Sequence, residues 1–372
     1  MSSVLSNPFL IVLLLAVGVL AIGLCEALIR RPLLAAWLVL GITVVTTALG
    51  APGQVGGGVV VRAADAVFAL VLVAAVARLL RVERLTTRDR LLIGLALLLA
   101  VSLLRGLPRY GLGAVLEFRT FLHVFGAALY FASVRPHPAL LERVGRLWLG
   151  AGVALAGIVA LRWTATFAGF DLGPFAAGHA SAQYALRAVD GPTSFIIGQA
   201  FVIALPIAQE RGRDRDWRRH LAIAFGILVV LLNRRTVWVA VLAGLVLLVL
   251  RSKEVRRRLA PLLVGAAVIS SVALLALPDS VDSGEDVGSS ATNTDTLVGR
   301  VEGWEALLTE RPQGFEWVIG EPAGSGFSRL VGENKVSSNP HNFYIEVFLR
   351  TGIIGLVCML ALYVTALKAL RR

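Results

Sequence analysis

The chain has 372 residues, of which 57% are hydrophobic and 16% charged, and its formal net charge is +12. Soluble domains usually carry about a quarter charged residues, so this composition excludes an ordinary soluble protein. Runs of about 20 apolar residues can span a bilayer, and such runs recur from one end of the chain to the other. Cys25 and Cys358 both lie within apolar runs, which predicts neither a disulfide framework nor a metal site.

The apolar runs predict an all-α, polytopic helical membrane protein with about eleven transmembrane helices. They lie at 8–29, 32–49, 59–80, 91–105, 112–132, 144–166, 191–209, 219–232, 236–250, 259–277 and 341–367. Because several spans follow the first, that run is not interpreted as a cleaved signal peptide. We expect three regions, namely a transmembrane bundle (1–277), an extracytoplasmic loop or cap (278–340), and a final transmembrane helix with a cytoplasmic tail (341–372).

Clusters of basic residues between the spans predict the orientation of the chain. They are Arg78, Arg81, Arg84, Arg88 and Arg90; Arg211, Arg213, Arg215, Arg218 and Arg219; Arg251, Lys253, Arg256, Arg257 and Arg258; and Lys368, Arg371 and Arg372. Short loops rich in Lys and Arg stay in the cytoplasm, so these clusters explain most of the net charge without a nucleic-acid partner. Segment 278–340 and the N-terminus are thereby predicted on the outer face of the cytoplasmic (inner) membrane.

Segment 278–340 contains no apolar run of spanning length. Trp304, Phe315, Trp317 and Phe327 supply apolar anchors, which favours a small folded cap over a loose tether. The Gly-rich stretch 320–330 lacks both the lysine and the strand–loop–helix context of a phosphate-binding loop. We interpret it as a turn that folds the cap back.

Arginines also occur near the predicted outer face, where the orientation rule disfavours them. They are Arg105, Arg109, Arg119, Arg187, Arg234, Arg235 and Arg300. An ionisable group at membrane depth suggests function by default, although lipid headgroups, Glu117 or acidic loop residues could equally be the partners of the first four. Arg234 and Arg235 lie at the tip of a predicted short helical hairpin beside Trp238, and paired guanidinium groups there could bind phosphate oxygens.

Two further patterns lie nearer the C-terminus. Arg300 precedes Trp304 by one helical turn, so the two could share a face, unless Arg300 stacks on that indole or pairs with Glu302 or Glu305. In SSNPHNFY, Ser338 or Asn339 is the expected N-cap and Pro340 the first helical residue.

His341 is then expected in the first helical turn. The helix dipole and any neighbouring arginine favour a neutral imidazole, which can accept a proton as a general base. Asn342 could orient this imidazole or bind a sugar hydroxyl. His341 and Tyr344 could also be ordinary residues of the membrane interface.

These patterns, in this order, resemble the O-antigen ligase and O-antigen polymerase family of membrane glycosyltransferases. The matching residues are Asn233, Arg235 and Trp238; Gly299, Arg300 and Trp304; and Pro340, His341 and Asn342 with Gly352 and Gly355. The resemblance implies transfer of a glycan from a polyprenyl diphosphate carrier, such as undecaprenyl diphosphate, to a glycan or lipid-glycan acceptor at the outer face.

The resemblance also implies roles for single residues and no metal or cofactor. His341 would activate the acceptor hydroxyl, Arg234, Arg235 and Arg300 would bind the diphosphate, and Asn342, Trp238, Trp304 and Tyr344 would contact the substrates. Two positions depart from the family pattern: Asn233 replaces a serine, and Arg350 stands where an acidic residue is common.

Ligase and polymerase are not distinguished by these residues, and three other functions stay open. A transporter of a small molecule or a lipid-linked sugar is one, although internal repeats and broken helices, which are common in transporters, are not apparent. A membrane glycosyltransferase with an acidic base in its first outer loop is another, but 50–58 reads GAPGQVGGG and has no Asp or Glu. A non-catalytic relative is the third.

Overall fold

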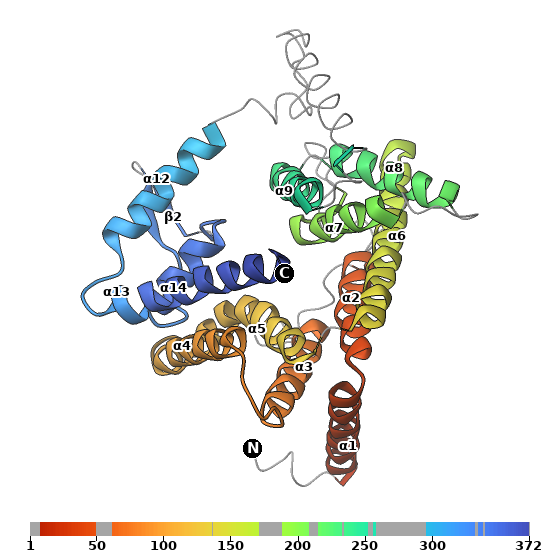
Figure 1. Cartoon of the computed structure of the whole chain (residues 1–372). Coiled ribbons are helices and arrows are strands. Elements are labelled where there is room, and N and C mark those ends of the chain that lie inside the picture. Colours follow the sequence, from red (N-terminus) through yellow and green to blue (C-terminus); the bar gives the residue numbers. More distant parts are fainter. Residues whose placement is uncertain are drawn as a thin grey trace. The chain divides into compact units, whose positions relative to one another are not determined.

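The computed structural model describes residues 8–49, 62–135, 137–170, 188–207, 215–232, 234–251, 256–257, 295–331, 334–337 and 339–371. These residues are mostly helical (Figure 1). The helices are α1 (Pro8–Arg30), α2 (Pro32–Leu49), α3 (Ala63–Leu79), α4 (Thr87–Tyr110), α5 (Leu112–Ser133), α6 (Pro138–Ala168), α7 (Gly191–Ile207), α8 (Arg215–Leu231), α9 (Arg235–Arg251), α12 (Asp295–Glu310), α13 (Glu316–Ile319) and α14 (Phe343–Arg371). The predicted span 259–277 lies outside the described residues.

Within the described ranges, α2, α4, α5, α6 and α14 are long and apolar enough to cross a membrane, and α7, α8 and α9 are shorter apolar helices. This supports the prediction of a helical membrane protein. The all-helical prediction needs one correction, because β1 (Arg329–Val331) and β2 (Asn334–Val336) form a two-stranded antiparallel sheet in which Arg329 pairs with Val336.

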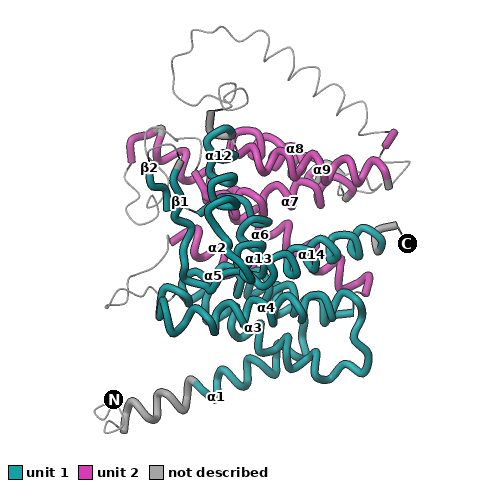
Figure 2. The backbone as a smooth tube through the Cα atoms, turned by 90° about the vertical axis from the view of Figure 1, so that its left-hand side faces the viewer, with its two compact units in different colours: residues 1–39, 53–136, 294–372 teal, residues 40–52, 137–293 magenta. Residues whose placement is uncertain are grey.

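The chain divides into two compact units (Figure 2). Unit 1 comprises residues 1–39, 53–136 and 294–372, and unit 2 comprises residues 40–52 and 137–293. Unit 1 therefore combines helices from the first third of the chain with its C-terminal part. Each unit is described by itself.

In unit 1, α5 packs against both α3 and α4. A capping box starts α4, because Thr86 Oγ1 accepts a hydrogen bond from the N–H of Asp89 (3.2 Å) and Thr86 N–H donates to the Asp89 carboxylate (2.9 Å). Gly111 joins α4 to α5 directly and has a φ of +52°, which glycine adopts without strain. The two helices therefore run in opposite directions.

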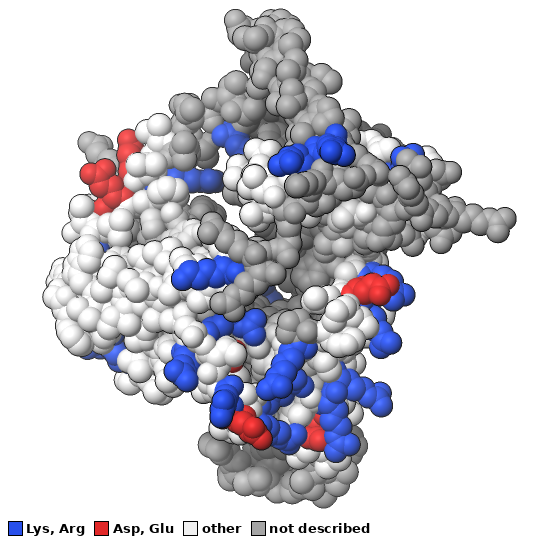
Figure 3. All heavy atoms as spheres, viewed as in Figure 1, with Lys and Arg blue, Asp and Glu red and all other residues white. Residues whose placement is uncertain are grey.

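Basic side chains gather around the connection between α3 and α4, at the other end of α4 from Gly111. Figure 3 shows them in the lower part of the picture, where Figure 1 places this connection. The exposed residues there are Arg81, Arg84, Arg88 and Arg90. The first predicted basic cluster is thus at one end of α4.

The segment after α13 docks at the Gly111 end of α4. The N–H of Ala323 donates to the carbonyl oxygen of Ser102 (3.0 Å), and Ser102 Oγ donates to the carbonyl oxygen of Glu321 (2.7 Å). A Cβ at Gly106 would overlap with the Ala323 carbonyl, so the absence of a side chain allows this contact. The interpretation of 320–330 as a turn that folds the cap back agrees with these contacts.

A buried arginine supports the cap from within. Arg329 of β1 lies against Gly303 of α12. A Cβ added at Gly303 would come within 3 Å of the Arg329 guanidinium. One of its N–H groups donates to the carbonyl oxygen of Phe327 (3.0 Å). Burial lowers the pKa of this guanidinium from its usual value. Glycine before Trp304 thus lets the hairpin approach α12.

A break at Gly352 divides α14. Its φ of +64° and ψ of −166° are not helical, and a Cβ there would overlap with the backbone of Val318. The ring centroids of Tyr344, before the break, and Tyr363, after it, lie 6.2 Å apart, so the two parts angle towards each other.

The second part of α14, residues 353–371, extends about 28 Å at 1.5 Å per residue. This length alone approaches the roughly 30 Å hydrocarbon core of a bilayer. The predicted span 341–367 therefore contains a break that hydropathy did not predict, and the short helix before it need not lie within the membrane.

In unit 2, the core lies among α6, α7, α8 and α9. Val159, Ile197, Phe225 and Val237 are buried there, one from each helix. Gly152 of α6 faces the rings and methyl groups of its neighbours so closely that a Cβ would contact Phe225. Close approach over small residues is common where membrane helices pack.

Candidate functional site

The pattern of Arg300 and Trp304 and the segment around His341 lie together in unit 1. Trp304 Nε1 donates a hydrogen bond of 2.7 Å to the carbonyl oxygen of Pro340, the residue before His341. Arg300 lies one turn before Trp304 on α12, as predicted. Its side chain is exposed and forms no hydrogen bond or ion pair with any residue that the structure describes. The predicted pairs with Glu302 or Glu305 are therefore not formed.

His341 lies before α14, so its predicted place in the first helical turn is wrong. Its φ is +54°, a value that few residues other than glycine adopt, although histidine does so more often than most. The backbone N–H donates to Asn339 Oδ1 (2.8 Å), and the residue is exposed. Unusual backbone conformations concentrate at functional sites, which supports a functional hypothesis for this histidine.

Asn342, rather than Ser338 or Asn339, is the N-cap of α14. Its Oδ1 accepts hydrogen bonds from the backbone N–H groups of Tyr344 (3.1 Å) and Ile345 (3.4 Å). These bonds satisfy donors that the first helical turn leaves without partners. The positive φ of the preceding residue prevents the helix from starting earlier. Only the side-chain oxygen of Asn342 takes part in these capping bonds.

Aromatic packing fixes the beginning of α14 on α5. The ring of Phe343 lies 6.0 Å from that of Phe121 and 6.3 Å from that of Phe125, between centroids. Tyr344, the next residue, is exposed. The segment that carries His341 is thus held on one side by α5 and on the other by α12.

Arg350 is fully buried at 1% exposure and lies at the centre of an ionic cluster. It donates to Glu321 Oε2 (3.0 Å) and Ser325 Oγ (2.7 Å), forms an ion pair with Glu117, and lies 4.8 Å above the ring of Phe327. A buried charge is tolerated only when it is paired and hydrogen-bonded. These partners explain the arginine that departs from the family pattern.

The same cluster holds the segment 320–326 in place. Glu117 of α5 accepts hydrogen bonds from the N–H groups of Gly324 (3.0 Å) and Gly326 (3.1 Å). Arg311 donates to Glu321 Oε2 at 2.6 Å. We call Arg350, Glu117, Glu321, Arg311 and Ser325 the Arg350 cluster. It joins α5, α14 and the cap.

Other arginines near the predicted outer face also have protein partners. Arg105 lies 3.8 Å from the carboxylate of Glu316, an acidic residue of the cap, and Arg119 lies 3.1 Å from that of Asp65. The pair of Arg105 fits the expected partnership with an acidic loop residue. Arg119 instead pairs with an acidic residue of α3, which was not among the expected partners. Arg187 and Asn233, like the N-cap candidate Ser338, lie outside the described part of the chain.

The sequence patterns gave no indication of a contact between α3 and α5. Asp65 Oδ1, which forms an ion pair with Arg119, also lies 3.0 Å from His123 Nε2. The His123 ring stacks on Phe68 at 4.3 Å between centroids. Polar side chains often join helices in this way within membranes. The residues are far apart in sequence, so hydropathy alone could not pair them.

The remaining predicted residues belong to unit 2. Arg235 opens α9, immediately after the turn from α8, so the predicted helical hairpin is present. Arg234 donates to the carbonyl oxygen of Val189 (3.0 Å), and Trp238 Nε1 donates to that of Val229 (2.8 Å). Both arginines are half-buried.

In the described ranges, no three His, Cys, Asp or Glu side chains lie together as a metal site would require. The groups that the site offers to a ligand are imidazole, guanidinium, indole and amide. Spanning-length helices indicate a helical membrane protein. The docked polar cap holds the exposed His341 beside Trp304, which makes this segment the candidate site.

Residues 220–360 match the family model described as O-antigen ligase. The match runs from the arginine pair of unit 2 to the histidine segment of unit 1, and it confirms the predicted resemblance to an O-antigen ligase-like family over these residues. Comparison with curated proteins and with solved structures gives no match.

Proposed function

We propose that the protein is a glycosyltransferase that moves a glycan from a polyprenyl diphosphate carrier to a hydroxyl group of an acceptor glycan or lipid-linked glycan. The observation that carries this proposal is the contact between Trp304 and the Pro340 carbonyl, within a segment that matches the O-antigen ligase family. It presents His341 at the surface, beside the helix that carries an exposed Arg300.

In the proposed reaction, His341 accepts the proton of the acceptor hydroxyl. The hydroxyl oxygen forms a bond to the anomeric carbon of the glycan. The bond between that carbon and the diphosphate breaks, and polyprenyl diphosphate leaves with the electron pair. A general base near the acceptor is useful because a neutral hydroxyl is a weak nucleophile.

A departing diphosphate gains negative charge and needs stabilisation more than it needs a proton. We assign this role to Arg300 and, from the family resemblance, to Arg234 and Arg235 of unit 2. The planar guanidinium binds phosphate oxygens through two parallel hydrogen bonds and keeps its charge at every physiological pH. Arginines in this proposal supply the positive charge without a metal ion.

The four remaining residues are assigned to substrate contact. Trp304 and Trp238 each use the indole N–H on a backbone carbonyl, so each would offer a ring face to a sugar. Asn342 would donate from its NH₂ group, and Tyr344 from its exposed hydroxyl. These contacts fix orientation more than they contribute chemistry.

The packing of unit 1 favours an active site on the outer face of the inner membrane. The cap docks at the Gly111 end of α4, and the basic connection to α3 lies at the other end. Basic connections stay in the cytoplasm, so the cap and the adjoining His341 would face outward, on the side of the acceptor glycan.

The test is genetic complementation in the host. Deletion of the gene should shorten or uncap a surface glycan, or leave it bound to its carrier, and the wild-type gene should restore it. We expect His341→Ala to fail completely although the protein reaches the membrane in normal amounts. His220→Ala, at an exposed histidine on α8, is the matched control and should restore the glycan.

Full restoration by His341→Ala would remove the proposed base. An unchanged glycan in the deletion strain, together with loss of movement of a solute across the membrane, would favour the transporter instead.

A further inference from the structure

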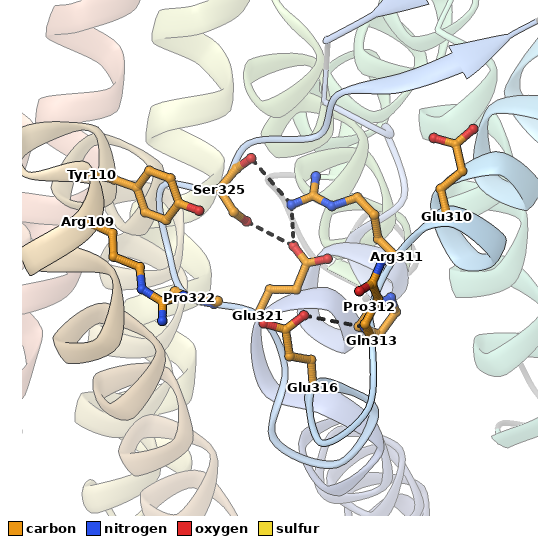
Figure 4. Close-up of a pocket in the computed structure, with 10 residues that line it drawn as sticks. All are labelled: Arg109, Tyr110, Glu310, Arg311, Pro312, Gln313, Glu316, Glu321, Pro322 and Ser325. Carbon is orange, nitrogen blue, oxygen red and sulfur yellow. Dashed lines mark hydrogen bonds and ion pairs between the residues drawn. The ribbon is translucent and has the colours of Figure 1, made fainter.

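A polar pocket of about 170 Å³ opens in unit 1 between the end of α4 and the cap. Figure 4 shows Arg109 and Tyr110 of α4 on one side and Arg311, Pro312 and Gln313, which follow α12, on the other. The polar contacts of the active-site proposal do not use these residues. The pocket is thus a separate cavity of the same unit.

The pocket offers hydrogen-bond donors and acceptors together. Arg109 is exposed, and its guanidinium has no hydrogen-bond or ion-pair partner among the residues that the structure describes. Gln313 provides both a carbonyl oxygen and an NH₂ group, and Glu310 is an exposed acceptor. Tyr110, 42% exposed, adds a ring face and a hydroxyl.

The charges of the pocket lie close to balance. Arg311 is engaged by Glu321 at 2.6 Å, and Glu316 lies 3.8 Å from Arg105. Of the charged side chains that line the pocket, those of Arg109 and Glu310 have no such partner in the described part of the chain, and their charges have opposite signs. A diphosphate would meet carboxylates on the pocket wall, whereas neutral hydroxyl groups could donate to the carboxylates and accept from the guanidinium.

We propose that this pocket binds a neutral sugar residue of the glycan. Mixed planar donors and acceptors beside an aromatic ring suit a sugar ring, which carries hydroxyl groups at its edge and C–H groups on its faces. This inference rests on the proposed function, because it concerns the glycan that the enzyme would transfer or extend.

The position of the pocket suits a sugar that lies further along the glycan chain than the sugar that reacts at His341. Trp304, which contacts the residue before His341, lies about 9 Å along α12 from Glu310, at 1.5 Å per residue. A glycan chain with its reacting end at His341 could therefore reach the pocket with a later sugar. The pocket would select among glycans without taking part in bond formation.

The first test measures binding to the purified full chain in detergent. Saturation-transfer NMR would use methyl glycosides of glucose, galactose, mannose and N-acetylglucosamine, with inorganic pyrophosphate as the competing anion. We expect at least one glycoside to bind. Its affinity should fall about tenfold or more in Arg109→Ala, which loses a charged donor, and roughly two- to tenfold in Gln313→Ala, which loses a neutral one.

Arg90→Ala is the matched control, because it removes an exposed arginine from the other end of the same helix, and it should bind as the wild type does. Binding of no glycoside, equal binding by Arg109→Ala, or displacement of the glycoside by pyrophosphate would each overturn the proposal.

The second test separates the inference from the proposed function. In a transfer assay, Arg109→Ala should raise KM and leave kcat unchanged; the substrate whose KM rises, donor or acceptor, identifies the source of the sugar. His341→Ala should abolish transfer while glycoside binding persists. If His341→Ala abolishes transfer and Arg109→Ala changes neither KM nor binding, the pocket inference fails and the proposed function stands. If the wild type transfers no glycan, the proposed function fails.

Discussion

Arg350 shows how a single residue can organise the packing of unit 1. Its guanidinium is buried, and its partners come from α5 and from the cap segment after α13. Removing one member of a buried ion pair leaves an uncompensated charge in a poorly solvated place, which typically costs about 3–5 kcal/mol. The stability of the docked cap should therefore depend on this arginine.

We expect Arg350→Met to lower the thermal unfolding midpoint of the purified protein clearly and to reduce its amount in the membrane, because the buried Glu321 and the partly buried Glu117 would lose a charged partner. Arg300→Met, at an exposed arginine of the same unit, should leave the midpoint unchanged. Combining Arg350→Met with Glu117→Gln should recover part of the loss. Equal midpoints for Arg350→Met and the wild type would contradict a structural role for the cluster.

Trp304 offers a second test at this scale, because its hydrogen bond to Pro340 adjoins the proposed base. Trp304→Phe keeps an aromatic ring and removes the donor, a change of about 0.5–1.5 kcal/mol for a typical hydrogen bond. We expect glycan transfer to fall several-fold with little change in the unfolding midpoint. Trp317→Phe, at a half-exposed tryptophan of α13, should transfer normally. Normal transfer by Trp304→Phe would show that this bond does not position the histidine.

At the scale of elements, the docking of the cap on α4 depends on glycine. A Cβ at Gly106 would overlap with the Ala323 carbonyl, whereas a Cβ at Gly94, on the same helix, meets no atom within 4 Å. Alanine favours helix over glycine by up to about 1 kcal/mol, so the two substitutions should act in opposite directions.

We predict that Gly106→Ala lowers the unfolding midpoint and makes the cap more sensitive to limited proteolysis, while Gly94→Ala leaves both unchanged or slightly raises the midpoint. Proteolysis is informative because it reports local opening of the cap as well as global unfolding. Similar cleavage of the two variants would argue against the docking of segment 320–326 on α4.

Hydropathy predicted most of the helices because a run of apolar side chains is a local signal. The α8–α9 hairpin and its arginine pair follow directly from that pattern, as does the one-turn spacing of Arg300 and Trp304. The break at Gly352 has no such signal. It depends on Val318 approaching the backbone, a contact between residues that the sequence separates by a loop and a hairpin.

The beginning of α14 shows the same limit more locally. Ser338, Asn339 and Asn342 can all cap a helix by residue type, and the choice among them depends on the positive φ of His341. Two hydrogen bonds support this backbone conformation, one from Trp304 to the Pro340 carbonyl and one from the His341 N–H to Asn339. The partners of Arg350 were equally hidden, because four of them lie more than twenty positions away in sequence. Tertiary contacts, rather than local propensity, determined these features.

At the scale of the whole molecule, the prediction concerns the orientation of unit 1 in the membrane. Arg84, in the basic connection between α3 and α4, and Lys335, on β2 of the cap, are both exposed and should lie on opposite sides. A cysteine at each position, with Cys25 and Cys358 replaced by serine, reports the side through an impermeant maleimide.

We expect Lys335→Cys to react in cells whose inner membrane is intact and Arg84→Cys to react only after that membrane is permeabilised. The background without an added cysteine should not react in either case. Labelling of Arg84→Cys in intact cells would place the basic connection outside and would remove the argument for an outward active site.

The most direct measurement of the central claim follows both products of the proposed reaction in one assay. The purified full chain, reconstituted in lipid vesicles with a polyprenyl diphosphate-linked glycan and an acceptor glycan, should lengthen the acceptor and release an equal amount of polyprenyl diphosphate. His341→Ala should produce neither product, while His220→Ala should produce both at the wild-type rate. Transfer by His341→Ala at the wild-type rate, or release of the carrier without lengthening of the acceptor by the wild type, would contradict the account.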